Sequence, residues 1–164
     1  MQARVDPRDF AVRAHADQTY GGQPYVAHLD AVANLVGEDA NLRAVAYLHD
    51  VVEDTPVTAD DVVRTFGPTI GAAVAMVTDP PGESRTVRKA ALHVRLSEAD
   101  ASDAAVRLAL HVKVADRLAN VRACVADEDP RLAMYRKEHR AFRPAAHRPG
   151  MCDALWTELD DLLA

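Results

Sequence analysis

The 164-residue sequence has few cysteines, few aromatic residues and no long apolar run. Cys124 and Cys152 lack the CxxC spacing of a thiolate zinc site, so we expect two free thiols and no disulfide scaffold. No segment approaches the roughly 18 apolar residues that a membrane-spanning helix needs. Residues 1–10 hold four charged side chains and no apolar stretch, which is not typical of a signal peptide. These absences predict a cytoplasmic protein without a membrane partner.

The charge balance argues against duplex nucleic acid as a partner. Lys and Arg total 19 and Asp and Glu total 25, which gives a formal charge of −6 at pH 7. Duplex-binding domains usually carry a basic excess. Because 16 of the 19 cations are arginines, which bind phosphate well, a local phosphate-binding patch is still compatible with the sequence. The length and an apolar fraction of 49% are typical of one folded domain covering residues 1–164.

Apolar residues recur at helical spacing along almost the whole chain. Glycines and prolines interrupt this pattern, and no sustained stretch alternates apolar and polar residues as a strand would. Thr58 and Asp61 have the spacing of a helix capping box. The sequence therefore predicts an all-α, single-domain bundle of about eight to nine helices. The predicted helices cover about residues 10–16, 25–36, 42–52, 58–66, 69–77, 85–95, 103–123, 130–142 and 151–163.

The strongest chemical signal is the run His49-Asp50-Val51-Val52-Glu53-Asp54 at the end of the third predicted helix. On a continuous helix, His49 and Glu53 would share one face, and Asp50 and Asp54 the next. A neighbouring imidazole and carboxylate can hold one metal ion, while two further carboxylates act on what the ion binds. The alternative is a solvated acidic helix end, which would oppose the helix dipole.

Two further residues could complete a metal site. His28 lies between apolar residues early in the second predicted helix, where a histidine can also be an ordinary core residue. Asp116 lies inside the longest predicted helix, where an unpaired buried carboxylate would be costly. The alternative for Asp116 is a surface ion pair with Arg117. Asn120 lies one turn after Asp116 on the same face, and Lys113 lies one turn before it.

These motifs occur in an order that resembles the HD-domain metal-dependent phosphohydrolases. More specifically, they resemble the small alarmone hydrolases and the hydrolase domain of bifunctional alarmone synthetase/hydrolase enzymes. The resemblance spans about residues 10–125, and residues 130–163 would then form closing helices. The matching text is His15-Ala16-Asp17-Gln18, Gly22-Gln23-Pro24-Tyr25-Val26-Ala27-His28, His49-Asp50-Val51-Val52-Glu53-Asp54-Thr55, Thr58, Phe66-Gly67, Val77-Thr78 and Lys113-Val114-Ala115-Asp116-Arg117-Leu118-Ala119-Asn120.

The resemblance implies a helical domain with one divalent metal ion, usually Mn²⁺. The implied metal ligands are His28, His49, Asp50 and Asp116. Their chemistry agrees, because two imidazoles and two carboxylates suit Mn²⁺, Fe²⁺, Co²⁺ or Zn²⁺ and leave coordination positions open. The resemblance also implies that Glu53 and Asp54 are the catalytic pair and that Asn120 helps to hold a nucleotide. Which of the two carboxylates activates water is left open by the sequence.

Other positions bear on the substrate. Arg85, Arg88 and Lys89 follow a Pro-Pro-Gly loop at helical spacing, so Arg88 and Lys89 are candidates for binding a diphosphate; the alternative is a solvated basic face. Thr19 and Tyr20 occupy places where alarmone hydrolases commonly carry two basic residues, which leaves the substrate open. Tyr135 could cover a nucleobase, although a core position is the other interpretation. Trp156 belongs to an apolar stripe that would close the bundle.

Three functions are compatible with these features. The first is hydrolysis of the 3′-pyrophosphate of guanosine tetra- or pentaphosphate, giving GDP or GTP and pyrophosphate. Because the chain ends soon after the predicted bundle, we expect hydrolysis without alarmone synthesis. The second is hydrolysis of another small nucleotide, such as a dinucleotide 2′-phosphate or a mononucleotide. The third is a non-catalytic nucleotide-binding module, which the presence of Glu53 and Asp54 disfavours.

Overall fold

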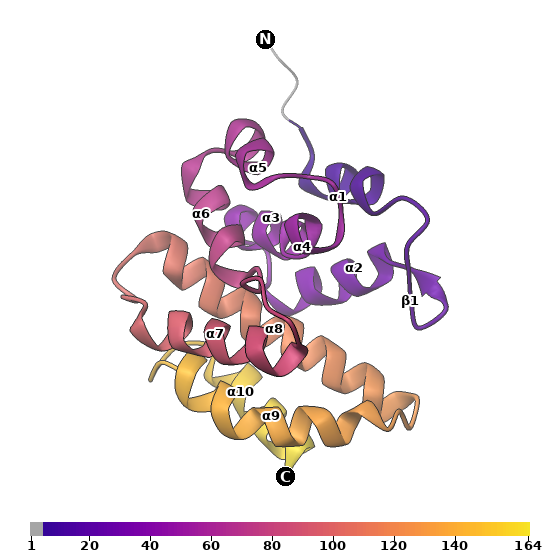
Figure 1. The fold of residues 1–164 in the computed structure, drawn as a ribbon, viewed down its shortest axis with the longest axis vertical. Helices are drawn as coiled ribbons and strands as arrows, with labels where there is room; N and C mark the ends of the chain where they lie inside the picture. The colour runs from indigo at the N-terminus through magenta and orange to yellow at the C-terminus, as the bar shows by residue number, and fades with distance from the viewer. Residues whose placement is uncertain (1–4) are drawn as a thin grey trace.

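A computed structural model describes residues 5–164, so the expectation for residues 1–10 falls partly outside the described range. The regular elements of this part of the chain are ten helices and one hairpin of two short strands, which confirms the all-α prediction (Figure 1). The elements are α1 (Pro7–His15), β1 (Thr19–Tyr20), β2 (Gln23–Pro24), α2 (Val26–Leu35), α3 (Ala40–Leu48), α4 (Val51–Asp54), α5 (Ala59–Phe66), α6 (Pro68–Val77), α7 (Arg85–Glu98), α8 (Ala104–Ala126), α9 (Arg131–Ala146) and α10 (Asp153–Leu163). None of the described helices has the length and apolarity to cross a membrane.

The long helix α8 organises the fold because it is buried on two faces. One face carries Ala109 and Val112 into a core shared with α2, α3 and α6, and the other carries Leu110 and Leu118 into a core shared with α7, α9 and α10. Figure 1 shows α8 crossing the molecule between these two groups of helices. A helix that is apolar nearly all round is expected at such a central position. Trp156 is 3% exposed in the second core, as predicted.

The third predicted helix is divided in two, which corrects the expectation of one helix over residues 42–52. Helix α3 ends at Leu48, residues 49 and 50 form a turn, and α4 is a separate helix of four residues. Asp50 has φ −104° and ψ −4°, which departs from regular helix geometry. The interruption matters for the site, because adjacent residues of a regular helix point about 100° apart. In the turn, His49 and Asp50 instead reach the same point.

Two helix starts follow side-chain capping signals, and two helix ends differ from the predicted bounds in the C-terminal part. Thr58 and Asp61 form the predicted capping box, and Asp103 caps the start of α8. Helix α9 runs four residues beyond Phe142, and α10 begins at Asp153, after Cys152 in a left-handed conformation with φ 58°. Cys124 and Cys152 are both free thiols, as expected.

A short hairpin lies between α1 and α2. Gly21 and Gly22 both have positive φ, 56° and 78°, which suits the two-residue turn joining β1 to β2. Gln18 anchors the segment before the hairpin: its Oε1 accepts from His15 Nδ1 at 2.9 Å, and its Nε2 donates to the backbone oxygen of Asp54. The hairpin is thereby attached to α4, and Tyr20 is held beside α2.

Candidate metal centre and active-site cleft

The four predicted metal ligands meet at one place. His28 comes from α2, His49 and Asp50 from the turn between α3 and α4, and Asp116 from the middle of α8. Asp50 Oδ2 lies 3.0 Å from His49 Nε2 and 3.9 Å from His28 Nε2. Asp116 Oδ1 lies 3.1 Å from His28 Nε2 and 3.4 Å from His49 Nε2. The alternative for Asp116 is wrong, because the Arg117 guanidinium pairs with Glu138 and not with Asp116.

His49 is oriented to offer one nitrogen to a ligand. Its Nδ1 donates to the backbone oxygen of Ala46 at 2.6 Å, which leaves Nε2 without a proton in the neutral ring. That Nε2 atom is buried and has no hydrogen-bond partner of its own. A buried polar atom without a partner is costly unless a ligand satisfies it. A hydrogen bond from the second ring nitrogen to a carbonyl is also the usual support of a metal-binding histidine.

The donor set fits a divalent metal ion. Donors about 2.1 Å from one ion lie roughly 3 to 4 Å apart, and the four measured imidazole–carboxylate distances fall in that range. The site also attracts positive charge: burial alone would lower the pKa of His49, but Asp50 and Asp116 raise it well above its usual value. Two imidazoles and two carboxylates could therefore hold the divalent ion that an HD-type site implies.

Neighbouring side chains support these donors. The Tyr25 hydroxyl donates to Asp50 Oδ2 at 2.6 Å, and its ring stacks on His15. Lys113 Nζ lies 3.7 Å from Asp116 Oδ2 in a buried position. Burial would raise the pKa of Asp116, but His49, His28 and Lys113 hold it well below its usual value. Both carboxylates are therefore kept in the charged form that binds metal.

Glu53 and Asp54 face the same cleft as the metal donors. Burial raises the pKa of Glu53 to about 7, with Asp79 and Asp50 adding to the effect. Burial and Asp50 also raise the pKa of Asp54, whose Oδ2 lies 3.3 Å from the Tyr25 hydroxyl. Carboxylates with raised pKa values beside a metal site are typical of proton-transfer groups.

Asp79 is a site residue that the sequence analysis missed. It lies in the loop after α6, its side chain is 4% exposed, and its carboxylate pairs with Lys89 Nζ at 2.8 Å. Burial would raise the pKa of Asp79, but the hydrogen bond from Lys89 and the positive charges of Lys89 and Lys113 lower it. The Thr-Asp-Pro-Pro sequence marked only a loop, and nothing local showed that the loop returns to α4.

Five cations also line this cleft. Arg85, Arg88 and Lys89 come from α7, and Arg88 and Lys89 are half-buried; Lys113 and Arg117 come from α8 and are buried. The predicted basic cluster therefore shares a cleft of about 280 Å³ with the candidate metal donors, and an anionic substrate would suit this cleft. Asn120 also lines this cleft.

A network of side chains from α7, α8 and α9 borders the cleft. The Arg117 guanidinium lies 4.9 Å from the Tyr135 ring centre and donates to Glu138, which also accepts from Arg85. Tyr135 is 8% exposed and contacts both the second core and the cleft, so both interpretations of Tyr135 describe part of its surroundings. No sequence motif indicated the Arg117–Glu138 pair.

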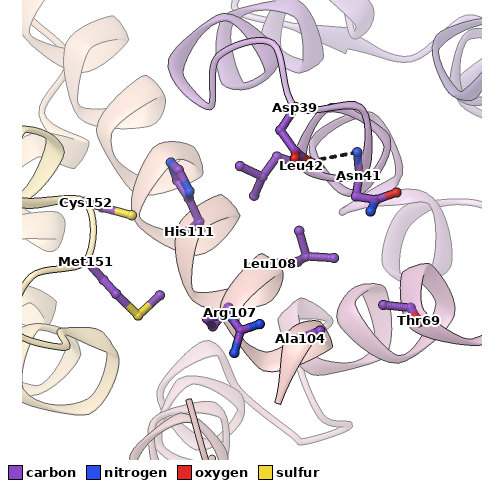
Figure 2. A pocket seen from close by; sticks show the side chains of 10 residues that line it. All are labelled: Asp39, Asn41, Leu42, Thr69, Ala104, Arg107, Leu108, His111, Met151 and Cys152. Carbon is purple, nitrogen blue, oxygen red and sulfur yellow. Dashed lines mark hydrogen bonds between the residues drawn. The ribbon is translucent and has the colours of Figure 1, made fainter. Parts of the chain in front are cut away.

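A second cavity, of about 420 Å³, shares no residue with this cleft (Figure 2). Its walls come from α3, α6, α8 and the segment before α10. Figure 2 shows His111, Met151 and Cys152 on one side, and Asp39, which caps α3 by accepting from Asn41 N, on the other. Its single carboxylate is occupied by this cap, so the cavity offers none of the paired donors found in the cleft.

Sequence comparisons place this geometry in a family. The HD domain model matches residues 8–152. A Synechocystis protein named probable guanosine-3′,5′-bis(diphosphate) 3′-pyrophosphohydrolase is 37% identical over 163 residues, covering 93% of this chain and 21% of that protein. The bifunctional (p)ppGpp synthase/hydrolase SpoT of Escherichia coli is 33% identical, covering 98% of this chain and 23% of SpoT. The chain thus spans about a fifth of the length of these curated relatives.

Solved structures confirm the fold. The structure described as a metazoan ortholog of SpoT that hydrolyzes ppGpp superposes with a TM-score of 0.79 at 24% identity, covering 95% of this chain and 90% of that chain. Lmo0812 from Listeria monocytogenes superposes with a TM-score of 0.62 at 21% identity, covering 87% of this chain and 99% of that chain. With the family model matching most of its length and the His-Asp donors converging as described, the chain belongs to the HD domain family.

Proposed function

We propose that this protein is a divalent-metal-dependent phosphohydrolase that removes pyrophosphate from the 3′ position of guanosine tetra- or pentaphosphate. The observation that supports the proposal is that His28, His49, Asp50 and Asp116 converge beside a cleft, which Glu53, Asp54 and five cations also line. The named activity of the Synechocystis relative, which matches 93% of this chain, supports the choice of substrate. The proposed activity of these residues is hydrolysis alone.

The proposed metal ligands are His28, His49, Asp50 and Asp116, and the proposed ion is Mn²⁺. A mixture of imidazole and carboxylate donors is borderline-hard, which suits Mn²⁺ while also accepting Zn²⁺, Fe²⁺ or Co²⁺. When bound, such an ion polarises a phosphoryl group and lowers the pKa of water.

Glu53 and Asp54 are the proposed catalytic pair. In the proposed reaction, water attacks the phosphorus attached to the 3′ oxygen, and the bond between that phosphorus and the 3′ oxygen breaks. Glu53 takes up a proton from the water, because a pKa of about 7 leaves it partly ionised and basic near neutral pH. Asp54, beside the Tyr25 hydroxyl, orients the water. The leaving 3′ oxygen gains a proton, and pyrophosphate and GDP or GTP are released.

Arg88 and Lys89 are the proposed phosphate contacts. Arg88 has one guanidinium nitrogen 3.4 Å from the Gly82 backbone oxygen and no ion pair among the described residues, so its remaining donors can reach an anion. Lys89 pairs with Asp79 and adds positive charge to the same cleft. Asn120 lines the cleft as well, but both polar atoms of its side chain are already engaged.

A second substrate class is favoured by one observation. At the hairpin, Tyr20 lines the cleft where alarmone hydrolases commonly carry a basic residue. The five cations that line the cleft come from α7 and α8, and the hairpin residue in this lining is the neutral Tyr20. A nucleotide with fewer phosphates on the hairpin side, such as a dinucleotide 2′-phosphate or a mononucleotide, would suit this arrangement.

The test is a hydrolysis assay with the metal-free protein reloaded with Mn²⁺. Guanosine tetraphosphate should yield GDP and pyrophosphate, both measured by ion-exchange chromatography, at a rate at least 10²-fold above that of Glu53→Gln. His111→Ala, which removes an imidazole from the separate cavity, should retain activity.

The outcomes separate the candidate functions. Turnover of other nucleotides at tenfold or greater preference over guanosine tetraphosphate would replace the substrate and keep the chemistry. Nucleotide binding without turnover under Mn²⁺, Zn²⁺, Fe²⁺ and Co²⁺ would identify a binding module and refute the enzymatic proposal.

A further inference from the structure

Asn120 has no free hydrogen-bond donor for a bound nucleotide. Its Nδ2 donates to the backbone oxygen of Asp116 at 3.0 Å and to Asp116 Oδ1 at 2.8 Å. Its Oδ1 accepts from the Tyr20 hydroxyl at 2.5 Å. The opposite amide orientation would place an oxygen against two acceptors, so these partners define which end is the nitrogen. The side chain of Asn120 therefore acts on Asp116.

Tyr20 contacts the same group of residues in two ways. Its hydroxyl holds Asn120, and its ring stacks on the His28 imidazole with ring centres 4.6 Å apart and planes 20° from parallel. Burial raises the pKa of Tyr20 far above neutral pH, so the hydroxyl remains a donor. Stacking restricts rotation of the imidazole. One residue of the hairpin thus touches His28 directly and Asp116 through Asn120.

We propose that Tyr20 and Asn120 are positioning residues for the metal ligands: the Tyr20 ring fixes the His28 imidazole, and the Asn120 amide fixes the Asp116 carboxylate. The inference rests on the proposed metal site, but not on the identity of the substrate. Groups that orient metal ligands from the next shell typically change metal affinity by about 10- to 100-fold. In this protein the supporting residues are Tyr20 of the hairpin and Asn120 of α8. The Asp116 oxygen that accepts from Asn120 is Oδ1, which also lies 3.1 Å from His28 Nε2.

This arrangement gives Tyr20 a task different from that of a substrate-binding cation. An aromatic ring is rigid and neutral, so it can pack against a metal-binding imidazole without repelling the ion. The hydroxyl then donates to the amide oxygen of Asn120. Substrate phosphates are left to the cations of α7 and α8.

The experiment measures metal affinity by competition with a chelating dye, using Mn²⁺ and Co²⁺ with the full chain. Asn120→Ala should weaken binding at least tenfold. Tyr20→Phe keeps the ring and should lose less affinity than Tyr20→Leu, which loses both contacts. The visible spectrum of bound Co²⁺, which reports coordination geometry, should change in Asn120→Ala. Tyr135→Phe, a tyrosine of the same cleft that bonds none of the four ligands, should leave affinity unchanged.

Steady-state kinetics at saturating metal separates positioning from substrate contact. If Asn120 acts on Asp116, Asn120→Ala should keep the wild-type KM once the metal site is filled. An unchanged metal Kd together with a raised KM would overturn the inference and make Asn120 a substrate contact. Circular dichroism of the metal-free variants shows whether each one folds. If the wild-type protein itself takes up no metal ion, the proposed function fails; equal binding by wild type and variants would refute only the positioning role.

Discussion

Metal binding should stabilise this fold, because the four donors come from three separate parts of the chain. An ion held by His28, Asp116 and the His49–Asp50 turn joins α2, the α3–α4 turn and α8. Unfolding separates these elements and destroys the site, so the free energy of metal binding adds to the free energy of unfolding. The prediction is that the protein loaded with Mn²⁺ melts at a higher temperature than the same protein in a chelator.

The size of this effect can be worked out. Free metal at about 100 times its Kd adds about 2.7 kcal/mol to the free energy of unfolding. For a domain of this size, each kcal/mol raises Tm by about 2–4 °C. The expected difference between metal-loaded and chelated protein is therefore about 5–11 °C, measured by differential scanning calorimetry at one fixed free-metal concentration.

Matched variants make the measurement specific. Asp116→Ala removes a donor that lies 3.1 and 3.4 Å from the two imidazoles, so it should abolish most of the metal-dependent shift. His111→Ala removes a histidine that lies outside the cleft, so its shift should equal that of the wild type whatever its own Tm. A full shift in Asp116→Ala, or the loss of the shift in both variants, would refute the assignment of the metal centre.

Further predictions concern catalysis and packing. Glu53→Gln should keep the metal-dependent Tm shift but lower turnover about 10²-fold or more, and equal turnover would remove Glu53 from the mechanism. Because ionised Glu53 is the active form, the rate should rise as pH increases through about 7. Asp79→Asn removes a charge that raises the Glu53 pKa, so the same rise in rate should occur at lower pH. A rise that stays at the wild-type pH would contradict this. Arg88→Ala should raise KM for an anionic substrate more than it lowers kcat, as seen in initial-rate assays. Phe142→Ala, fully buried in the second core, should lower the free energy of unfolding by about 3–5 kcal/mol in urea titrations.

The comparison of sequence and structure is clearest at the His49-Asp50 motif. The residue types and their order indicated a metal site, because apolar packing does not select such side chains. The expected continuous helix was wrong, since α3 ends at Leu48 and α4 begins at Val51, although Asp50 and Asp54 still meet at the Tyr25 hydroxyl as their spacing predicted. Hydrophobic periodicity does not reveal a single turn between two helices of similar composition. That turn is what lets adjacent residues converge.

The sequence by itself determined the helices and the chemistry of the metal donors, because both depend on local spacing and on residue type. Only the tertiary structure decided which distant side chains meet. Tyr20 and Asn120, 100 positions apart, become hydrogen-bond partners only when the hairpin lies against α8. Asp79 reaches Glu53 and Lys89 only when the loop after α6 folds over α4. Helical periodicity gives the buried face of each helix but not the way two helices cross, and it is this crossing that sets such contacts.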